Sequence, residues 1–358
     1  MMMLNDTNLL DQDAFVVHTT QELLLQATRV HASDIHIEAQ EHQYRIRLRQ
    51  DGLLHDLRTV QNTLGQRMMA RFKILARLDV SERRLPQDGR FRFQPDSATW
   101  HDGRISTCPT LFGEKLVIRL LDPLSIHGSL DTLGFESLQL TQFLHALEQP
   151  QGLILVTGPT GSGKTLTLYT ALSRLNTPRV NITSVEDPVE IQVPGINQVA
   201  INPRIGLTFP VILRALLRQD PDVLMVGEIR DGETAEIAIQ AAQTGHLVLS
   251  TVHTNNTVET ITRLCQMGIA RYPLATALSL IVAQRLVRRL CSTCKVPLSP
   301  TFHDAAPLPH PQCDSPTPPT FFKPVGCAQC QLGFSGRIGL YEVLPITPTL
   351  QALIFDSV

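Results

Sequence analysis

The sequence predicts an α/β protein, in which a mostly parallel β-sheet is covered by helices and follows a smaller α+β domain. From Gly152 onward, short buried-type strands alternate with helical segments, which is typical of a parallel sheet with helices on its faces. Upstream, apolar residues alternate with arginine in Tyr44–Arg49, which indicates a strand with one face toward water. The buried-type strands are predicted at 153–156, 180–185, 223–226 and 247–250.

Residues typical of helix caps, turns and linkers divide the chain into segments. Thr20 precedes an apolar helical pattern and is expected to cap that helix. Asp122-Pro123 and the Gly- and Ser-containing residues after them indicate a linker. The expected segments are 1–19 (disordered or the start of a linker), 20–122 (α+β domain), 123–134 (linker), 135–290 (α/β core), 291–330 (cysteine module with a Pro-rich loop) and 331–358 (start of a helical region, apparently truncated).

Composition limits the class of protein. The formal net charge of −2 argues against a surface that binds nucleic acid broadly. The first residues include acids and no basic stretch, so a signal peptide is not expected. No apolar run approaches the ~20 residues that span a bilayer. Four of the seven cysteines form two CxxC pairs, which in a reducing compartment favours a metal over disulfides. We therefore expect a soluble cytoplasmic protein.

The strongest single motif is a phosphate-binding loop. An octapeptide matches G-x-x-x-x-G-K-[ST], with an apolar strand before it and a helix after it. Its glycines let backbone N–H groups converge on phosphate oxygens, and the helix N-terminus adds partial positive charge. Lys164 would reach the β- and γ-phosphates, and the Thr165 hydroxyl would bind Mg²⁺. The predicted nucleotide-binding residues are Gly158, Pro159, Thr160, Gly161, Ser162, Gly163, Lys164 and Thr165.

Carboxylates and histidines follow the neighbouring predicted strands. Glu186 ends one strand, and Glu228 ends another after Gly227, where an Asp that helps to hold Mg²⁺ is more usual. Because strand carboxyl ends form the ligand-binding edge of such sheets, either carboxylate could activate water or bind the metal through water. His253 ends the fourth strand and could sense the γ-phosphate. His246 begins that strand, so its position suggests a structural role.

Five motifs occur in order along the core: 156–165, 184–190, 217–222, 227–231 and 244–255. Together they resemble the successive motifs of the secretion ATPases, and most closely of the type II secretion and type IV pilus-assembly ATPases. The resemblance covers about residues 20–350. It implies a RecA-like hexameric motor that hydrolyses ATP to drive assembly of pilin-like subunits. It also implies a PAS-like N-terminal domain, an inner-membrane platform protein and pilus or secretion components as partners, and a cytoplasmic location peripheral to the inner membrane.

The resemblance also assigns roles to individual residues. Gly227-Glu228 is similar to the normal form of the second motif in this family, so Glu228 would be the catalytic carboxylate. Glu186 would be an acidic-box residue that helps with Mg²⁺ and water. His246 and His253 match the histidine box of the family. Which carboxylate is the base, Glu186 or Glu228, stays open.

Two arginines upstream are candidates to contact the nucleotide. The segments 31–38, 84–90 and 104–107 resemble parts of the second N-terminal domain of the family, and they carry Arg90 and Arg104. An arginine presented to the γ-phosphate can speed phosphoryl transfer by ~10³–10⁵-fold. Without the resemblance, both arginines read as a solvated basic strand edge. That interpretation is kept for Arg45, Arg47, Arg49, Arg92 and Arg119.

Cys291, Cys294, Cys327 and Cys330 form two complete CxxC knuckles. Four thiolates suit tetrahedral Zn²⁺, whereas the alternative is two pairs of free or redox-active thiols. The assembly ATPases of the family carry a matching tetracysteine module, which implies structural zinc here. Retraction ATPases generally lack it. The Pro-rich spacer between the knuckles contains Cys313, which we expect to be free.

Other readings remain open at this point. The chain resembles a short form that lacks the first N-terminal domain of longer members, so it is either naturally short or truncated. A nucleotide-gated scaffold with little turnover, or a pilus-retraction or competence motor, would share most of these motifs. A RecA-like nucleic-acid motor is disfavoured by the near-neutral charge and by the lack of an aromatic and basic stretch.

Overall fold

The computed structural model describes residues 6–94, 100–121, 129–298 and 321–356, and side chains from residue 13 onward. Cys313, most of the Pro-rich spacer and linker residues 123–128 lie outside the described residues. The chain forms two compact units, each considered by itself. The N-terminal unit contains residues Met1–Gly128 and Asp187–Ala200, and the C-terminal unit contains Ser129–Glu186 and Ile201–Val358.

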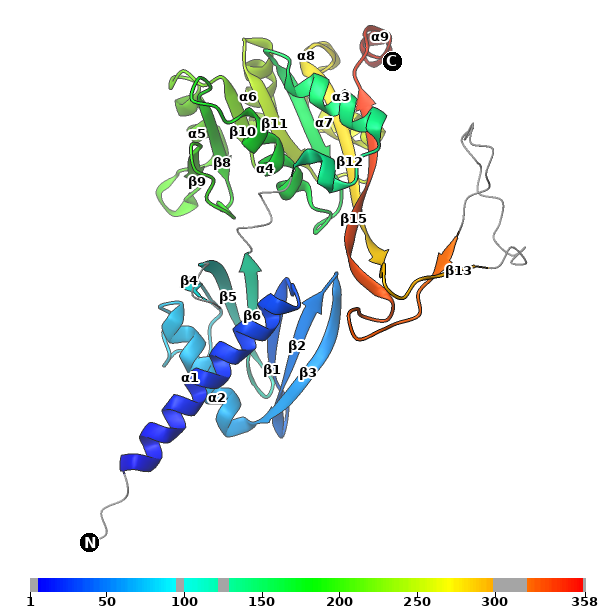
Figure 1. The fold of residues 1–358 in the computed structure, drawn as a ribbon. Coiled ribbons are helices and arrows are strands. Elements are labelled where there is room, and N and C mark those ends of the chain that lie inside the picture. Colours follow the sequence, from blue (N-terminus) through cyan, green and yellow to red (C-terminus); the bar gives the residue numbers. More distant parts are fainter. Residues whose placement is uncertain (1–5, 95–99, 122–128, 299–320, 357–358) are drawn as a thin grey trace. The chain divides into compact units, whose positions relative to one another are not determined.

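The N-terminal unit is built on a six-stranded antiparallel sheet in the order β3-β2-β1-β6-β5-β4. Two helices cover one face of this sheet (Figure 1). Alternate strand residues such as Ile35, Ile37 and Ile46 are fully buried and pack with Leu23 and Phe72 from the helices, as period-2 patterning requires. The elements are α1 (Asp6–Arg29), β1 (Asp34–Ala39), β2 (Gln43–Gln50), β3 (Leu53–Gln61), α2 (Asn62–Leu75), β4 (Gln87–Phe93), β5 (His101–Thr110) and β6 (Gly113–Leu121).

Helix α1 differs from the expectation at its N-terminus. It begins at Asp6, so residues 6–19, expected to be disordered or a linker, are helical. Thr20 is not a cap, because its hydroxyl donates to the carbonyls of Val16 and Val17 within the helix, at 3.0 and 2.8 Å. Threonine can make such bonds inside a helix, and buried Val16 extends the apolar stripe toward the N-terminus.

The C-terminal unit is built on a sheet whose strands follow the order β15-β12-β7-β11-β10-β8. Strands β12, β7, β11, β10 and β8 are parallel, and the four predicted buried strands are confirmed as β7, β8, β10 and β11. Every residue of these four is buried, because helices cover both faces. Up to β11 the elements are η2 (Leu130–Leu133), α3 (Ser137–Leu147), β7 (Gly152–Thr157), α4 (Lys164–Leu175), β8 (Ile182–Glu186), β9 (Asn197–Ala200), η3 (Pro203–Ile205), α5 (Phe209–Leu216), β10 (Val223–Val226), α6 (Gly232–Gln243) and β11 (Leu247–Val252).

Two long strands at one edge of this sheet were not predicted. Strand β15 runs antiparallel to β12, from the pair Leu280↔Pro345 to the pair Arg288↔Arg337, and the two form an extended ribbon (Figure 1). We expected a helical region from residue 331, but only α9 is helical there. The two strands are separated in sequence by the whole cysteine module, so no short turn motif between them predicts their pairing. The remaining elements are α7 (Thr257–Gln266), α8 (Arg271–Ala277), β12 (Leu278–Leu290), β13 (Val296–Pro297), β14 (Phe322–Lys323), β15 (Phe334–Pro345) and α9 (Pro348–Asp356).

Among the described residues, no helix is both long and apolar enough to cross a membrane.

Candidate nucleotide and metal sites

The predicted phosphate loop connects β7 to α4. Gly158, Gly161 and Gly163 have φ angles of 144°, 78° and 89°, in the region that side-chain-bearing residues avoid. A Cβ at Gly158 would lie 2.3 Å from the carbonyl oxygen of Gln284, so the backbone approaches too closely for any other residue. Helix α4 begins at Lys164. The unpaired N–H groups of its first turn are therefore directed to the loop.

Lys164 is held inside the loop. Its side chain is 8% exposed, and Nζ donates to the carbonyl oxygens of Gly158 and Pro159 at 2.8 and 3.1 Å. Burial lowers the pKa of Lys164, and the negative charge of Glu228 partly opposes this shift. The ammonium is thus poised among weak neutral acceptors, which a phosphate would outcompete.

The loop fits a nucleoside polyphosphate by two further observations. Ser162 Oγ is a buried polar atom that has no hydrogen-bond partner among the described residues. A Cβ at Gly161 would meet no atom within 4 Å, so the tip of the loop borders open space. Thr165, in the first turn of α4, is exposed and free to ligate Mg²⁺. Pro159 and Thr160 are exposed beside it.

Glu228 and His253 meet at the carboxyl ends of β10 and β11. Glu228 Oε2 lies 3.4 Å from His253 Nε2 and 2.6 Å from Arg230 Nε, and its side chain is 13% exposed. Burial and the positive charge of Lys164 lower the pKa of His253, while Glu228 raises it. The net shift of its pKa is downward, which favours the neutral form of the imidazole. The cluster therefore pairs a carboxylate with an imidazole near the loop lysine.

Glu186 has a different environment. It ends β8 and is 4% exposed. One carboxylate oxygen accepts a hydrogen bond from the Ser184 hydroxyl at 2.6 Å, and the other accepts one from the Tyr169 hydroxyl. Tyr169 lies on α4, so this carboxylate joins the helix after the phosphate loop to the neighbouring strand.

Gly227 has a packing reason that the sequence did not show. A Cβ there would lie 3.2 Å from the carbonyl oxygen of Val185 and 3.3 Å from the Cα of Glu186. Its N–H donates to that same carbonyl at 2.8 Å. The glycine therefore lets the end of β10 pack closely on the end of β8, beside Glu186.

His246 directly precedes the first residue of β11, whereas His253 directly follows its last residue. The Nδ1 of His246 lies 3.1 Å from the carbonyl oxygen of Ala241, at the end of α6. Its own carbonyl accepts from the N–H of Gly152, at the start of β7. These contacts agree with the structural role that its position predicted.

Arg90 and Arg104 are neighbours within the N-terminal unit. They face each other across β4 and β5, and Arg90 is exposed. Arg104 Nη2 donates to the carbonyl oxygen of Val189 at 2.7 Å, and Nη1 lies 3.9 Å from Glu190. The five arginines that were interpreted as a solvated strand edge are instead ion-paired: Arg45 and Arg47 with Glu38, Arg49 and Arg119 with Asp34, and Arg92 with Asp102.

The four cysteines of the two knuckles come together, with all sulfur atoms within 4.8 Å of one another. The Cys291–Cys327, Cys294–Cys330 and Cys327–Cys330 sulfur pairs are 3.9, 3.6 and 3.6 Å apart. Zn–S bonds of about 2.3 Å in a tetrahedron place sulfurs about 3.8 Å apart. Backbone N–H groups of Gly326 and Cys327 also donate to Cys294 and Cys330. The donor set and its spacing therefore fit a zinc ion.

Three residues near the loop were missed by the sequence reasoning. Tyr169 holds Glu186, Arg230 contacts Glu228, and Gln284 touches the phosphate loop. Only Gln284 could have been recognised from the sequence, because it is a polar residue that directly follows the apolar run 280–283. Tyr169 lies within an ordinary helical pattern, so nothing distinguished it.

Comparisons with known proteins agree with this architecture. Residues 10–358 match the family described as "Type II/IV secretion system protein". The chain is 52% identical to the type IV pilus assembly ATPase PilB of Pseudomonas aeruginosa, over 96% of this chain and 61% of that protein. It is 56% identical to the protein transport protein HofB homolog of Escherichia coli, over 92% of this chain and 70% of that protein.

Among solved structures, the pilus retraction motor PilT with bound ADP is 25% identical and aligns with a TM-score of 0.63, over 94% of this chain and 86% of that chain. The predicted fold, a RecA-like core with a smaller α+β N-terminal domain, is thereby confirmed. The chain spans about 60% of the length of the curated pilus assembly ATPases that it matches. The chain belongs to the type II/IV secretion system protein family.

Proposed function

We propose that this protein is an ATPase motor whose hydrolysis of ATP powers assembly of type IV pili or of type II secretion pseudopili. The proposal rests mainly on one observation. The glycine loop, Lys164 and the Glu228–His253 pair converge at the carboxyl ends of the parallel strands. The names of the relatives, pilus assembly ATPase and protein transport protein, support the same class of work.

The two carboxylates differ in a way that favours Glu228 as the base. Both oxygens of Glu186 already accept hydroxyl hydrogen bonds, and its side chain is enclosed. Glu228 keeps part of its surface accessible and lies beside His253. In this proposal Glu228 accepts a proton from the water that attacks the γ-phosphorus, as the bond to the β-phosphate oxygen breaks. Glu186 then positions α4 through Tyr169.

Bound Mg²⁺ would neutralise phosphate charge, held by Thr165. The protein's own residues do the rest. Lys164 would exchange its carbonyl partners for phosphate oxygens, and His253 would hydrogen-bond near the γ-phosphate as a neutral donor or acceptor.

Replacement of Glu228 by Gln tests this assignment. The amide keeps the size of the side chain but cannot take a proton, so steady-state phosphate release should fall by roughly 10²–10⁴-fold, while ATP affinity changes little. Lys164→Ala should instead weaken ATP binding itself. Phosphate release is measured on the oligomeric fraction, and affinity by displacement of a fluorescent nucleotide.

Glu236→Gln is the matched control, because Glu236 is exposed on α6 and belongs to no site. Equal phosphate release by Glu228→Gln and by the unaltered protein would sink the catalytic assignment. Tight ATP binding with no turnover in the unaltered oligomer would instead support a nucleotide-gated scaffold. Stimulation of turnover by DNA or RNA would point to a nucleic-acid motor.

The oligomeric state and the partners that we propose rest on the family and not on the geometry of the site. We infer a homo-oligomer, a hexamer in this proposal, that works at the cytoplasmic face of the inner membrane with a platform protein and pilus or secretion components. The tetracysteine cluster supports an assembly or secretion motor over a retraction motor. Recovery of a polytopic membrane protein and pilins by crosslinking in cells would test these partners. Recovery of neither would contradict them.

We propose further that the tetracysteine cluster binds one structural Zn²⁺. The sulfur spacing supports it. The described elements between the two knuckles also support it, because they are only the two-residue strands β13 and β14. Zinc would supply cohesion that so small a module cannot obtain from apolar burial.

Metal content decides this. Mass spectrometry of freshly purified protein should find about one zinc per chain, and Cys294→Ser should lose most of it. Cys265→Ser, at a half-buried thiol on α7 outside the cluster, should keep its zinc. Less than a tenth of an equivalent in the unaltered protein would exclude the site.

A further inference from the structure

Gln284 is a buried amide in a position where β12 meets the phosphate loop. Strand β12 pairs with β7 up to Ala283↔Thr157, and Gln284 is the next residue, level with the start of the loop. It is 3% exposed and directly follows the apolar run 280–283 on β12. Burial of an amide is unfavourable unless its polar atoms find partners.

The side chain of Gln284 finds a partner on α4. Its Oε1 accepts a hydrogen bond from the hydroxyl of Thr167 at 2.8 Å, and Thr167 is fully buried. Thr167 lies three residues after Lys164, in the first turn of the helix that begins at the loop. This bond therefore fixes the first turn of α4 to β12.

The same residue also contacts both ends of the loop. A Cβ at Gly163 would lie 2.8 Å from Gln284 Nε2, and one at Gly158 would lie 2.3 Å from its carbonyl oxygen. The glycines that open and close the phosphate loop therefore both pack on Gln284.

We propose that Gln284 is a positioning residue for ATP binding, which holds the phosphate loop in its phosphate-accepting conformation through Thr167 and the two glycines. The proposal rests on the proposed ATPase function and adds a residue to its binding step. Gln284 acts through the loop and not on the nucleotide, so its loss should be felt mainly in ATP affinity.

Gln284→Leu tests the role, since it keeps bulk but removes the acceptor for Thr167. We expect the KM for ATP to rise roughly tenfold, as for loss of one buried hydrogen bond. The kcat should stay within about threefold, so that saturating ATP restores turnover. A general folding defect would lower kcat and would not respond to ATP. Gln240→Leu, at an exposed glutamine on α6, is the matched control and should behave as the unaltered protein.

Thr167→Val removes the same hydrogen bond from the other side and guards against misfolding of the first variant. Its KM should rise at least as much, because the Thr167 hydroxyl also lies 3.4 Å from the Gly163 carbonyl oxygen. The effect of the double variant should be clearly less than additive, because both single variants remove the Gln284–Thr167 bond. A KM within twofold of the control for both Gln284→Leu and Thr167→Val would overturn the proposal, as would fully additive effects. If unaltered protein showed no ATP turnover sensitive to Lys164→Ala, the proposed function would fail instead, independently of Gln284.

Discussion

Glu38 shows how single residues neutralise the basic face of the N-terminal sheet. It lies on β1, is 9% exposed, and receives Arg45, Arg47 and Lys115 at 3.0, 2.7 and 3.0 Å. Burial alone would raise its pKa, but hydrogen bonds from Arg47 and Lys115 and their charges lower it to about 2. The alternation of arginine along β2 is therefore explained by a carboxylate on the next strand.

This low pKa predicts a pH dependence of stability. The folded pKa of Glu38 is about 2 against 4.5 for an unperturbed glutamate, so its stabilisation is present above pH 4.5 and is lost as pH falls toward 2. The full contribution is roughly 3 kcal/mol. Glu38→Gln should lower the free energy of unfolding at pH 7, and its difference from the unaltered protein should shrink below pH 4.5. Fluorescence of Trp100, the single tryptophan, follows this unit.

Glu41→Gln is the control for that series, because Glu41 is exposed in the β1–β2 turn. It should leave both the stability and its pH dependence unchanged. An unfolding free energy of Glu38→Gln that falls with pH in parallel with the unaltered protein would contradict the assignment.

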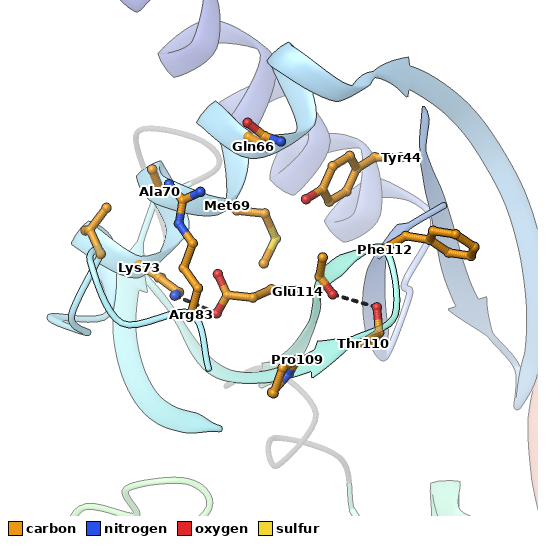
Figure 2. Close-up of a pocket in the computed structure, with 12 residues that line it drawn as sticks. Tyr44, Gln66, Met69, Ala70, Lys73, Arg83, Pro109, Thr110, Phe112 and Glu114 are labelled. Carbon is orange, nitrogen blue, oxygen red and sulfur yellow. Dashed lines mark hydrogen bonds and ion pairs between the residues drawn. The ribbon is translucent and has the colours of Figure 1, made fainter. Parts of the chain in front are cut away.

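Helix α2 and strand β6 are joined by a buried ion pair. Lys73 Nζ lies 2.6 Å from Glu114 Oε1, with side-chain exposures of 1% and 8%, and it also donates to the carbonyl of Glu82 at 2.7 Å. The pair borders a cavity of about 130 Å³, into which Tyr44 and Arg83 also project (Figure 2). Because both charges are satisfied within the fold, we read this cavity as part of the helix–sheet packing.

Breaking that pair should be costly. Lys73→Met leaves a buried carboxylate without its cation, so the N-terminal unit should lose about 3–5 kcal/mol of stability, measured by denaturant unfolding with Trp100 fluorescence. The double variant Lys73→Met, Glu114→Leu should regain most of the loss. Arg84→Met removes a cation from an exposed pair with Glu82 and should change little. A double variant as unstable as Lys73→Met would show that packing, not charge, dominates.

At the scale of the whole molecule, the proposed motor distributes its chemistry over two units. The loop, Glu228 and His253 belong to the C-terminal unit, whereas Arg90 and Arg104 belong to the N-terminal unit. The role proposed for the arginines can therefore be tested separately from that of Glu228.

Arg90→Ala tests whether Arg90 contacts the nucleotide. If Arg90 meets the γ-phosphate during turnover, kcat should fall by roughly 10³-fold with ATP affinity retained. Arg104→Ala should behave similarly, with an added loss of its bond to Val189. Arg92→Ala, on the same strand but paired with Asp102, is the control. Turnover of Arg90→Ala equal to that of Arg92→Ala would remove Arg90 from the site.

The predictions that held rest on local patterns. Period-2 alternation identified β2, and fully apolar runs between helical segments identified β7, β8, β10 and β11, since burial of both sheet faces leaves a direct imprint on sequence. The start of α1 was wrong, because Thr20 has the residue type of a cap but lies inside a longer apolar stripe. Strand β15 was missed because its partner is distant in the chain.

The sequence by itself determined the parallel core, the phosphate loop and the two cysteine knuckles, because each depends on residue types at short, fixed spacing. Only the tertiary structure decided which groups work together. The hydroxyls of Ser184 and Tyr169 donate hydrogen bonds to Glu186, whereas His253 lies beside Glu228. Gln284 supports a loop more than 100 residues away in the chain. These relations come from parallel pairing of strands that are far apart in sequence, which no local spacing records.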